Sequence, residues 1–272
     1  MQQTTIDGIR TYVIVNGREY PRAPRVWLNS VRHAPLCRAG LTLPDPDGTE
    51  MRRLAAGQAV ELHMGYRGVK PAVWKGTVEW VRPGTTDQVE LGAVGPEAIL
   101  ARTRITQAFM DETPEAILRH ALRATGLPLG KVDAPGVVLP RFAASNETIW
   151  ALAEKLELSC MQAFGLDMSR WTLWVDGAGN ACWGDFDDPS QTVVQGIASG
   201  GNLIEHTPAT DASALSMVET FLMPGLMHSQ SFRLCDARRG VDDVFRALRV
   251  RHEINGTSAR TFAWYGEEHG RY

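Results

Sequence analysis

The sequence predicts a mainly β protein in which two small β-barrels flank an α+β insert, and three observations support this. Residues 57–95 and 221–265 both contain short segments with alternating apolar positions, broken by glycine turns, as antiparallel strands do. Between them, after Thr113, the apolar spacing becomes helical. We therefore expect a first barrel over residues 1–103, an α+β domain over 104–200 and a second barrel over 201–272.

Length and charge limit the classes of function. The 272 residues suffice for two or three domains that each bury a core, and a net charge of −3 gives no general attraction to nucleic acid or anionic membranes. No apolar run reaches the roughly 18 residues that span a bilayer. The N-terminal residues lack the basic and then apolar order of a secretory signal, so we expect folding in a cytoplasm.

The cysteines are scattered and form no CxxC pair. Without a secretory signal we expect reduced, mostly buried thiols and no metal ligation, with a disulfide or a reactive thiol as the alternative. The four are Cys37, Cys160, Cys182 and Cys235.

The first segment is expected to contain five or six short antiparallel strands. Asn16-Gly17 predicts a tight hairpin turn. Residues 43–49 contain two prolines and Asp47-Gly48, which predict a loop, and Gly76 predicts a bulge within its strand. The predicted strands cover residues 10–17, 25–31, 60–64, 73–81 and 89–94.

The middle segment contains two predicted helices and a hairpin. Thr113 is a suitable N-cap followed by Pro114 at the first helical position, and Gly126 would end this helix. A second helix is expected over residues 145–158. Residues 171–175 and 181–183 would pair around a glycine-rich turn.

The last segment returns to the strand pattern. Its turns are expected at Gly200-Gly201, Pro224-Gly225 and Asn255-Gly256. The predicted strands cover residues 218–222, 231–235, 245–254 and 259–265.

Two acidic groups could carry chemistry. Asp185, Asp187 and Asp188 could bind a metal or act as general acid and base, but their place after a strand and before a proline favours a solvated loop. The pattern Asp45-x-Asp47-Gly48-x-Glu50 resembles the start of a calcium loop, yet it lacks the later ligands, so we expect a turn.

The histidines show no metal-ligand spacing, and the chain contains no nucleophile elbow, Walker loop or dinucleotide fingerprint. His252 is expected at the edge of a core, bonded to a backbone carbonyl. The sequence thus predicts no catalytic, cofactor-binding or metal-binding residues and no cofactor, and it does not identify the interface residues. The histidines are His33, His63, His120, His206, His228, His252 and His269.

Of the eight tryptophans, we consider six that fall in predicted strands. Aromatic residues in strands usually pack in a core or across strands, and an oligomer contact is the alternative. The six are Trp74, Trp80, Trp171, Trp174, Trp183 and Trp264.

Three passages resemble the baseplate and tail hub proteins of tailed bacteriophages. That family includes the late control protein D group, the Mu-like tail hub and the hub half of type VI secretion spikes. The passages are residues 56–68 with 73–78, residues 111–127, and residues 223–225 with 250–254 and Thr261. They follow the family order over nearly the whole chain, although each motif is built from structural residues.

The resemblance implies two tail-tube-like barrels per subunit and a homotrimer whose six barrels form a pseudo-six-fold ring. Such a ring would join a tail tube or distal tail protein to a spike or tail-tip protein, and would line the DNA channel without binding DNA specifically. The tape measure protein is a further implied partner. The implied location is the virion tail, after assembly in the bacterial cytoplasm, and the chain is shorter than family members with a fused spike or lysozyme domain.

Two other functions remain open at this stage. A tail-associated cell-wall hydrolase could use Asp185, Asp187 or Glu147 as its carboxylates. A carbohydrate-binding tail module could use the Trp171–Trp183 hairpin as a stacking platform.

Overall fold

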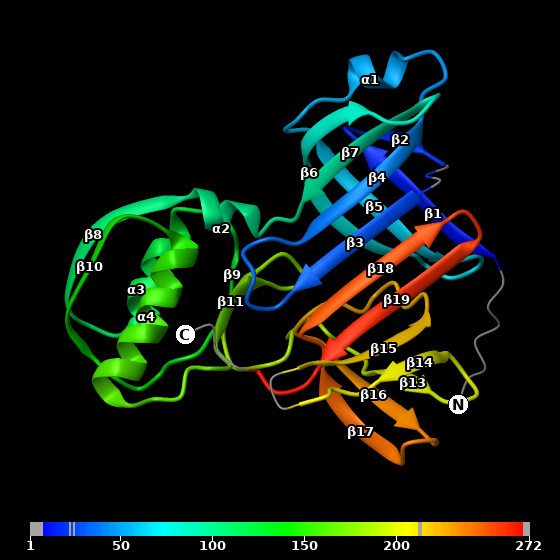
Figure 1. Cartoon of the computed structure of the whole chain (residues 1–272). Helices are drawn as coiled ribbons and strands as arrows, with labels where there is room; N and C mark the ends of the chain where they lie inside the picture. Colours follow the sequence, from blue (N-terminus) through cyan, green and yellow to red (C-terminus); the bar gives the residue numbers. More distant parts are fainter. Residues whose placement is uncertain (1–7, 22, 24, 212–213, 269–272) are drawn as a thin grey trace.

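In the computed structural model, most described strands belong to one eleven-stranded antiparallel sheet (Figure 1). The described residues are 8–21, 23, 25–211 and 214–268. The sheet order is β14-β15-β19-β18-β3-β4-β7-β6-β5-β1-β2. Its strands from the first segment are β1 (Ile9–Val15), β2 (Arg18–Tyr20), β3 (Arg25–Val31), β4 (Arg38–Pro44), β5 (Ala59–Tyr66), β6 (Ala72–Pro83) and β7 (Gln88–Val94). Those from the last segment are β14 (Leu203–Thr207), β15 (Ser216–Phe221), β18 (Arg249–Asn255) and β19 (Ser258–Tyr265).

The two terminal segments meet where β3 pairs with β18. Val26 lies opposite Ile254 and Leu28 opposite His252 in this pairing, and the other edge of β3 pairs with β4. A strand has only two edges, so β3 cannot also pair with β1 to complete a ring. The prediction of two closed barrels is therefore not confirmed: the described strands form a mainly β fold with one large sheet.

The first-segment strands nevertheless curl around a common core. Val13 and Val15 of β1 belong to the same buried apolar cluster as Val26 and Leu28 of β3. Four strands lie between β1 and β3 in the sheet order, so the sheet must bend to bring their side chains together. Leu222, Ile254 and Ala259 of the last segment join this cluster.

The middle segment builds a second core from helices and two small sheets. In Figure 1 its long pair β8–β10 passes around α3 and α4. The Oγ1 atoms of Thr113 and Thr148 cap α3 and α4, accepting from Ala116 N at 3.3 Å and Ala151 N at 3.1 Å. Among the described helices, none combines the length and the apolar composition needed to cross a bilayer. The helix α2 (Ala98–Arg102), at the end of the first segment, joins the second core through Leu100. The elements of the middle segment are β8 (Arg104–Glu112), α3 (Pro114–Arg123), β9 (Leu129–Val132), β10 (Leu139–Thr148), α4 (Ile149–Phe164), β11 (Thr172–Val175) and β12 (Ala181–Gly184).

A three-stranded sheet with the order β13-β16-β17 combines β13, from the end of the middle segment, with two strands of the last segment. These strands are β13 (Gln195–Ala198), β16 (Ser231–Asp236) and β17 (Val241–Arg246). Phe232 and Leu234 of β16 share a buried cluster with Val250 of β18 and Ala263 of β19. The small sheet and the end of the large sheet therefore enclose a third core.

Several local predictions are confirmed and others need correction. Asn16 and Gly17 have φ values of 48° and 81°, as the predicted tight hairpin turn between β1 and β2 requires. The strand β4 and the helix α1 (Thr49–Arg53) were not predicted. The interior residues of β4 are buried on both faces, so its apolar positions do not alternate.

Three boundaries also differ from the predictions. Residues 145–148 belong to β10, so the second helix begins at Ile149 and extends to Phe164. The predicted strand over residues 245–254 is divided between β17 and β18. The irregularity in β6 lies between Val78 and Trp80, not at Gly76.

Two glycines on the outer face of the sheet lie beneath tryptophan rings. Trp27 lies opposite Gly40, Gly40 opposite Gly92, and Gly92 opposite Trp80, in one row across four strands. A Cβ atom on Gly40 would collide with the Trp27 indole, and one on Gly92 with the Trp80 indole. Glycine is therefore required at both positions so that the rings can cover the backbone.

We predict that Gly40→Ala lowers the free energy of unfolding by about 1–3 kcal/mol, because the added methyl must displace the Trp27 ring. Urea unfolding monitored by circular dichroism measures this. Gly196→Ala in β13 is the control, since a Cβ there meets no atom within 4 Å and should leave stability equal or slightly higher. Equal stability of Gly40→Ala and the wild type would contradict the proposed close packing.

Candidate functional site

The buried guanidinium of Arg32, just after β3, contacts all three parts of the chain. Its Nε donates to Glu268 Oε2 at 2.9 Å and its Nη1 to Ser229 Oγ at 2.7 Å. Its Nη2 donates to the carbonyl of Arg170 in the middle segment at 2.8 Å. The guanidinium also lies 5.0 Å from the Trp174 ring centroid. Burial lowers the pKa of Arg32, and the charge of Glu268 opposes this.

Glu268 extends this contact into an ion-pair network with Arg246. Arg246 Nη1 lies 2.9 Å from Glu268 Oε1 and 2.7 Å from Asp185 Oδ1, and its Nε lies 2.6 Å from Asp187 Oδ1. Burial alone would raise the pKa of Glu268, but the His33 hydrogen bond and the charge of Arg32 contribute to lowering it to about 2. We name Arg32, Arg246, Asp185, Asp187 and Glu268 the junction network.

The acidic cluster singled out from the sequence lies in a loop where Asp187 is exposed and Asp185 partly exposed, and its carboxylates have partners within the protein. Asp185 and Asp187 are occupied by Arg246, and Asp188 is buried, where it accepts from Ser190 N at 2.8 Å and Gly177 N at 3.2 Å. A general acid–base pair needs a carboxyl group available to substrate. These three carboxylates instead fix the position of loops.

The acidic residues of the calcium-like pattern are likewise satisfied within the protein. Asp45 accepts from the backbone N–H groups of Glu50 and Met51, each at 2.9 Å. Glu50 accepts from the Tyr20 hydroxyl at 2.5 Å and pairs with Arg18 at 2.8 Å. The pattern therefore forms the turn before α1, as predicted.

Two buried histidines have both ring nitrogens engaged. His206 lies between Asp236 Oδ2 at 2.7 Å and the Tyr265 hydroxyl at 2.9 Å. The prediction for His252 is confirmed, since its Nε2 lies 2.8 Å from the Leu226 carbonyl and its Nδ1 is 2.9 Å from Thr261 Oγ1. Neither ring has a nitrogen left for a substrate. His269 lies outside the described residues.

The carbohydrate and hydrolase alternatives find little support in this geometry. Trp174 and Trp183 are buried, so their rings offer no face for a sugar. The Trp183 indole N–H donates to Glu157 Oε1 at 2.7 Å, and Trp171 meets Trp183 edge to face. Glu147 pairs with Lys155 at 2.7 Å. These residues act in packing and in local ion pairing.

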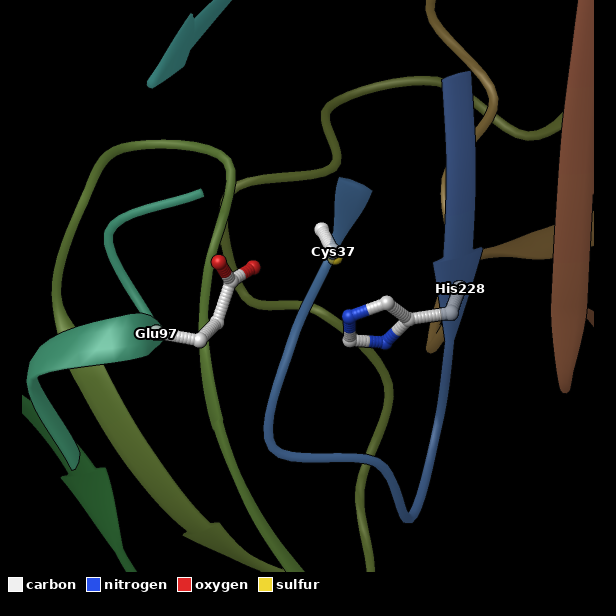
Figure 2. A group of neighbouring side chains, drawn as sticks. All are labelled: Cys37, Glu97 and His228. Atoms are coloured by element: carbon white, nitrogen blue, oxygen red, sulfur yellow. The ribbon is translucent and has the colours of Figure 1, made fainter. Parts of the chain in front are cut away.

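The structure brings together three buried side chains that the sequence analysis did not connect: Cys37, Glu97 and His228 (Figure 2). Their ligand atoms lie within 4.8 Å of one another. Burial raises the pKa values of Cys37 and Glu97 and lowers that of His228 to about 3. No local spacing joins positions so far apart, so only the tertiary fold reveals the group.

A cavity of about 480 Å³ adjoins this group and is partly lined by Glu97 and His228. Asp176, Asp188 and Gln230 also line it.

All four cysteines are free thiols, of which Cys235 is exposed and the other three are buried.

Comparison with known proteins shows which solved structures share this fold. No family model matches the chain, and no curated protein matches it in sequence. Solved structures do match: a tail protein from Neisseria meningitidis MC58 superposes with a TM-score of 0.69 at 12% identity, covering 96% of this chain and 97% of that one. The protein has the fold of a phage tail protein. The predicted resemblance is confirmed at the level of fold.

Two further tail-protein structures support the same assignment. The 43 kDa tail protein of prophage MuSo2 from Shewanella oneidensis gives a TM-score of 0.67 at 12% identity, with 95% of this chain and 97% of that chain covered. An E. coli component of the type VI secretion system, described as similar to T4 tail proteins gp27 and gp5, gives 0.65 at 10% identity over 95% and 78% of the two chains. The tail-protein fold therefore spans nearly the entire sequence.

We predict that Glu268→Gln lowers the free energy of unfolding at pH 7 by about 3–5 kcal/mol, because Arg32 would lose its buried partner. The Glu268 pKa is depressed, so this contribution is present above the ordinary glutamate pKa. It is lost as pH falls toward about 2. Denaturant titrations at several pH values should show the difference between variant and wild type shrinking below about pH 5.

Glu112→Gln is the control for this experiment, because Glu112 is exposed at the end of β8. Its stability should stay within about 0.5 kcal/mol of the wild type at each pH. A Glu268→Gln protein as stable as this control would contradict the role given to the junction network.

Proposed function

We propose that this protein is a structural component of a phage-type tail hub or baseplate and not an enzyme. The observation that carries the proposal is the superposition on a tail protein over 96% of the chain. The junction network adds support, because the carboxylates that a hydrolase would need are committed to arginine partners. The chain would act through its shape and its surfaces.

The finer proposal is a homotrimer that presents a pseudo-six-fold ring. Among the described residues, β1–β7 surround one apolar core and β13–β19 another, so seven strands enclose each core, with β13 coming from the end of the middle segment. Three chains would then supply six related units, although neither unit is a hydrogen-bonded barrel by itself. We propose residues 1–103, 104–200 and 201–272 as the corresponding domains.

Exposed sheet edges offer a physical route to such an assembly. β2 and β14 end the eleven-stranded sheet, while β13 and β17 end the three-stranded sheet. An edge strand carries unpaired N–H and C=O groups that a neighbouring chain can satisfy by adding a strand. Closing a ring of subunits would remove edges of this kind from solvent.

In this proposal the ring joins the tail tube or distal tail protein to the spike or tail-tip protein. The tape measure protein is a further proposed partner. DNA would pass through the lumen without specific binding, which agrees with a net charge of −3. The protein would reside in the baseplate or tip of a virion tail, after assembly in the bacterial host cytoplasm.

We predict that the protein will be found as a ring of three chains at the distal end of a tail. Light scattering coupled to size exclusion measures the mass of the purified protein, alone and with co-expressed tail proteins. Electron microscopy with a tag inserted beside Val69, an exposed loop residue, locates the chain in particles. A protein that stays monomeric with its tail partners and is absent from tails would contradict the proposal.

A further inference from the structure

We propose that Cys37, Glu97 and His228 bind a zinc ion, with water as the fourth ligand. This proposal is independent of the tail-hub function, and it replaces the expectation that the cysteines bind no metal. Thiolate sulfur, imidazole nitrogen and carboxylate oxygen are the three ligand types that proteins use for zinc. The three residues contribute one of each.

Zinc binding would require only small movements of the three side chains. The ligand atoms lie within 4.8 Å of one another, whereas ligands at ordinary zinc distances in a tetrahedral arrangement are about 3.3–3.8 Å apart. Figure 2 shows the three side chains converging on one space. A shift of about 1 Å or less per side chain would bring the atoms to bonding distance, which rotamer changes can supply.

The His228 ring is oriented for ligation through Nε2. Its Nδ1 lies 2.9 Å from Ser229 Oγ, which also accepts from Arg32 Nη1 at 2.7 Å. A hydroxyl oxygen has two lone pairs, so Ser229 Oγ can accept from both Arg32 Nη1 and His228 Nδ1–H. In that tautomer the Nε2 lone pair is free for the metal. Zinc-binding histidines are commonly held by such a bond from the second ring nitrogen.

Charge balance also favours a divalent cation. Glu97 is buried, and its Oε2 has no hydrogen-bond partner, which is costly for a polar atom. Zinc with one thiolate and one carboxylate is electrically neutral, so the bound group can be buried without a net charge. The nearby Arg32 charge is already balanced by Glu268 at 2.9 Å.

The backbone holds the three loops in place. Gly95 N donates to the Cys37 carbonyl at 2.9 Å, and His228 N donates to Ser30 Oγ at 3.1 Å. A Cβ on Gly95 would collide with Glu97 Oε2, so glycine there leaves the room that the carboxylate occupies. These contacts preorganise the ligands before any metal arrives.

The adjoining cavity provides a route for the ion and space for the fourth ligand. Its volume of about 480 Å³ exceeds what one water needs, and both Glu97 and His228 reach its wall. Cys37 and Glu97 belong to the first segment and His228 to the last. Bound zinc would therefore tie the loop before β4, the residue before α2 and the loop before β16.

The test is titration of chelator-treated, reduced protein with Co²⁺, followed by displacement with Zn²⁺. We expect one Co²⁺ per chain with a thiolate-to-cobalt charge-transfer absorption that Zn²⁺ abolishes. Saturating Zn²⁺ should also raise the midpoint of thermal unfolding, because the ion binds the folded state. Absence of both signals in the wild type would overturn the proposal.

Single substitutions test which side chains bind the metal. Cys37→Ser should lose the charge-transfer absorption, whereas Cys235→Ser, which removes the exposed thiol, should keep it. Glu97→Gln preserves the side-chain shape and should weaken Zn²⁺ binding at least about tenfold, which gives a second readout if Cys37→Ser fails to fold. Loss of absorption in Cys235→Ser, or unchanged binding in Glu97→Gln, would overturn the assignment.

Discussion

The buried guanidinium of Arg32 is the contact on which the arrangement of the three cores depends. Removing a guanidinium from water costs several kcal/mol unless its charge and its donors are satisfied. Here Glu268 supplies the charge, while Ser229 and the Arg170 carbonyl accept further hydrogen bonds. The Arg32 backbone N–H also donates to Leu248 O at 2.7 Å, next to the β3–β18 pairing. One residue thus joins the first segment to the other two.

The terminal segments form one sheet instead of two independent barrels, and Arg32 lies at their junction. Pairing of β3 with β18 uses the edge that a closed first barrel would need. The β3–β18 pairing instead fixes the unit formed by β1–β7 relative to the unit formed by β13–β19. The proposed ring would need a constant angle between these units, which a shared sheet supplies better than a flexible linker. The proposed zinc site lies at the same meeting of segments.

Local sequence patterns predicted most strands but not how they pair. Alternating apolar positions identified β5, β7 and β19, and the Asn16-Gly17 turn and the Thr113 cap were also evident. β4 was missed because both of its faces are buried. The pairing of Leu28 with His252 involves positions at opposite ends of the sequence, and no local periodicity encodes such a contact. The roles of Arg32 and Glu268 were hidden for the same reason.

The central claim is that β3, β18 and the middle core are held together at the Arg32 junction. Native-state hydrogen exchange, measured by mass spectrometry on peptides from β3, α4 and β18, tests it most directly. The account predicts that these three segments open together with one free energy, equal to that of global unfolding. Exchange of β18 amides at a much lower free energy than β3 amides would contradict it.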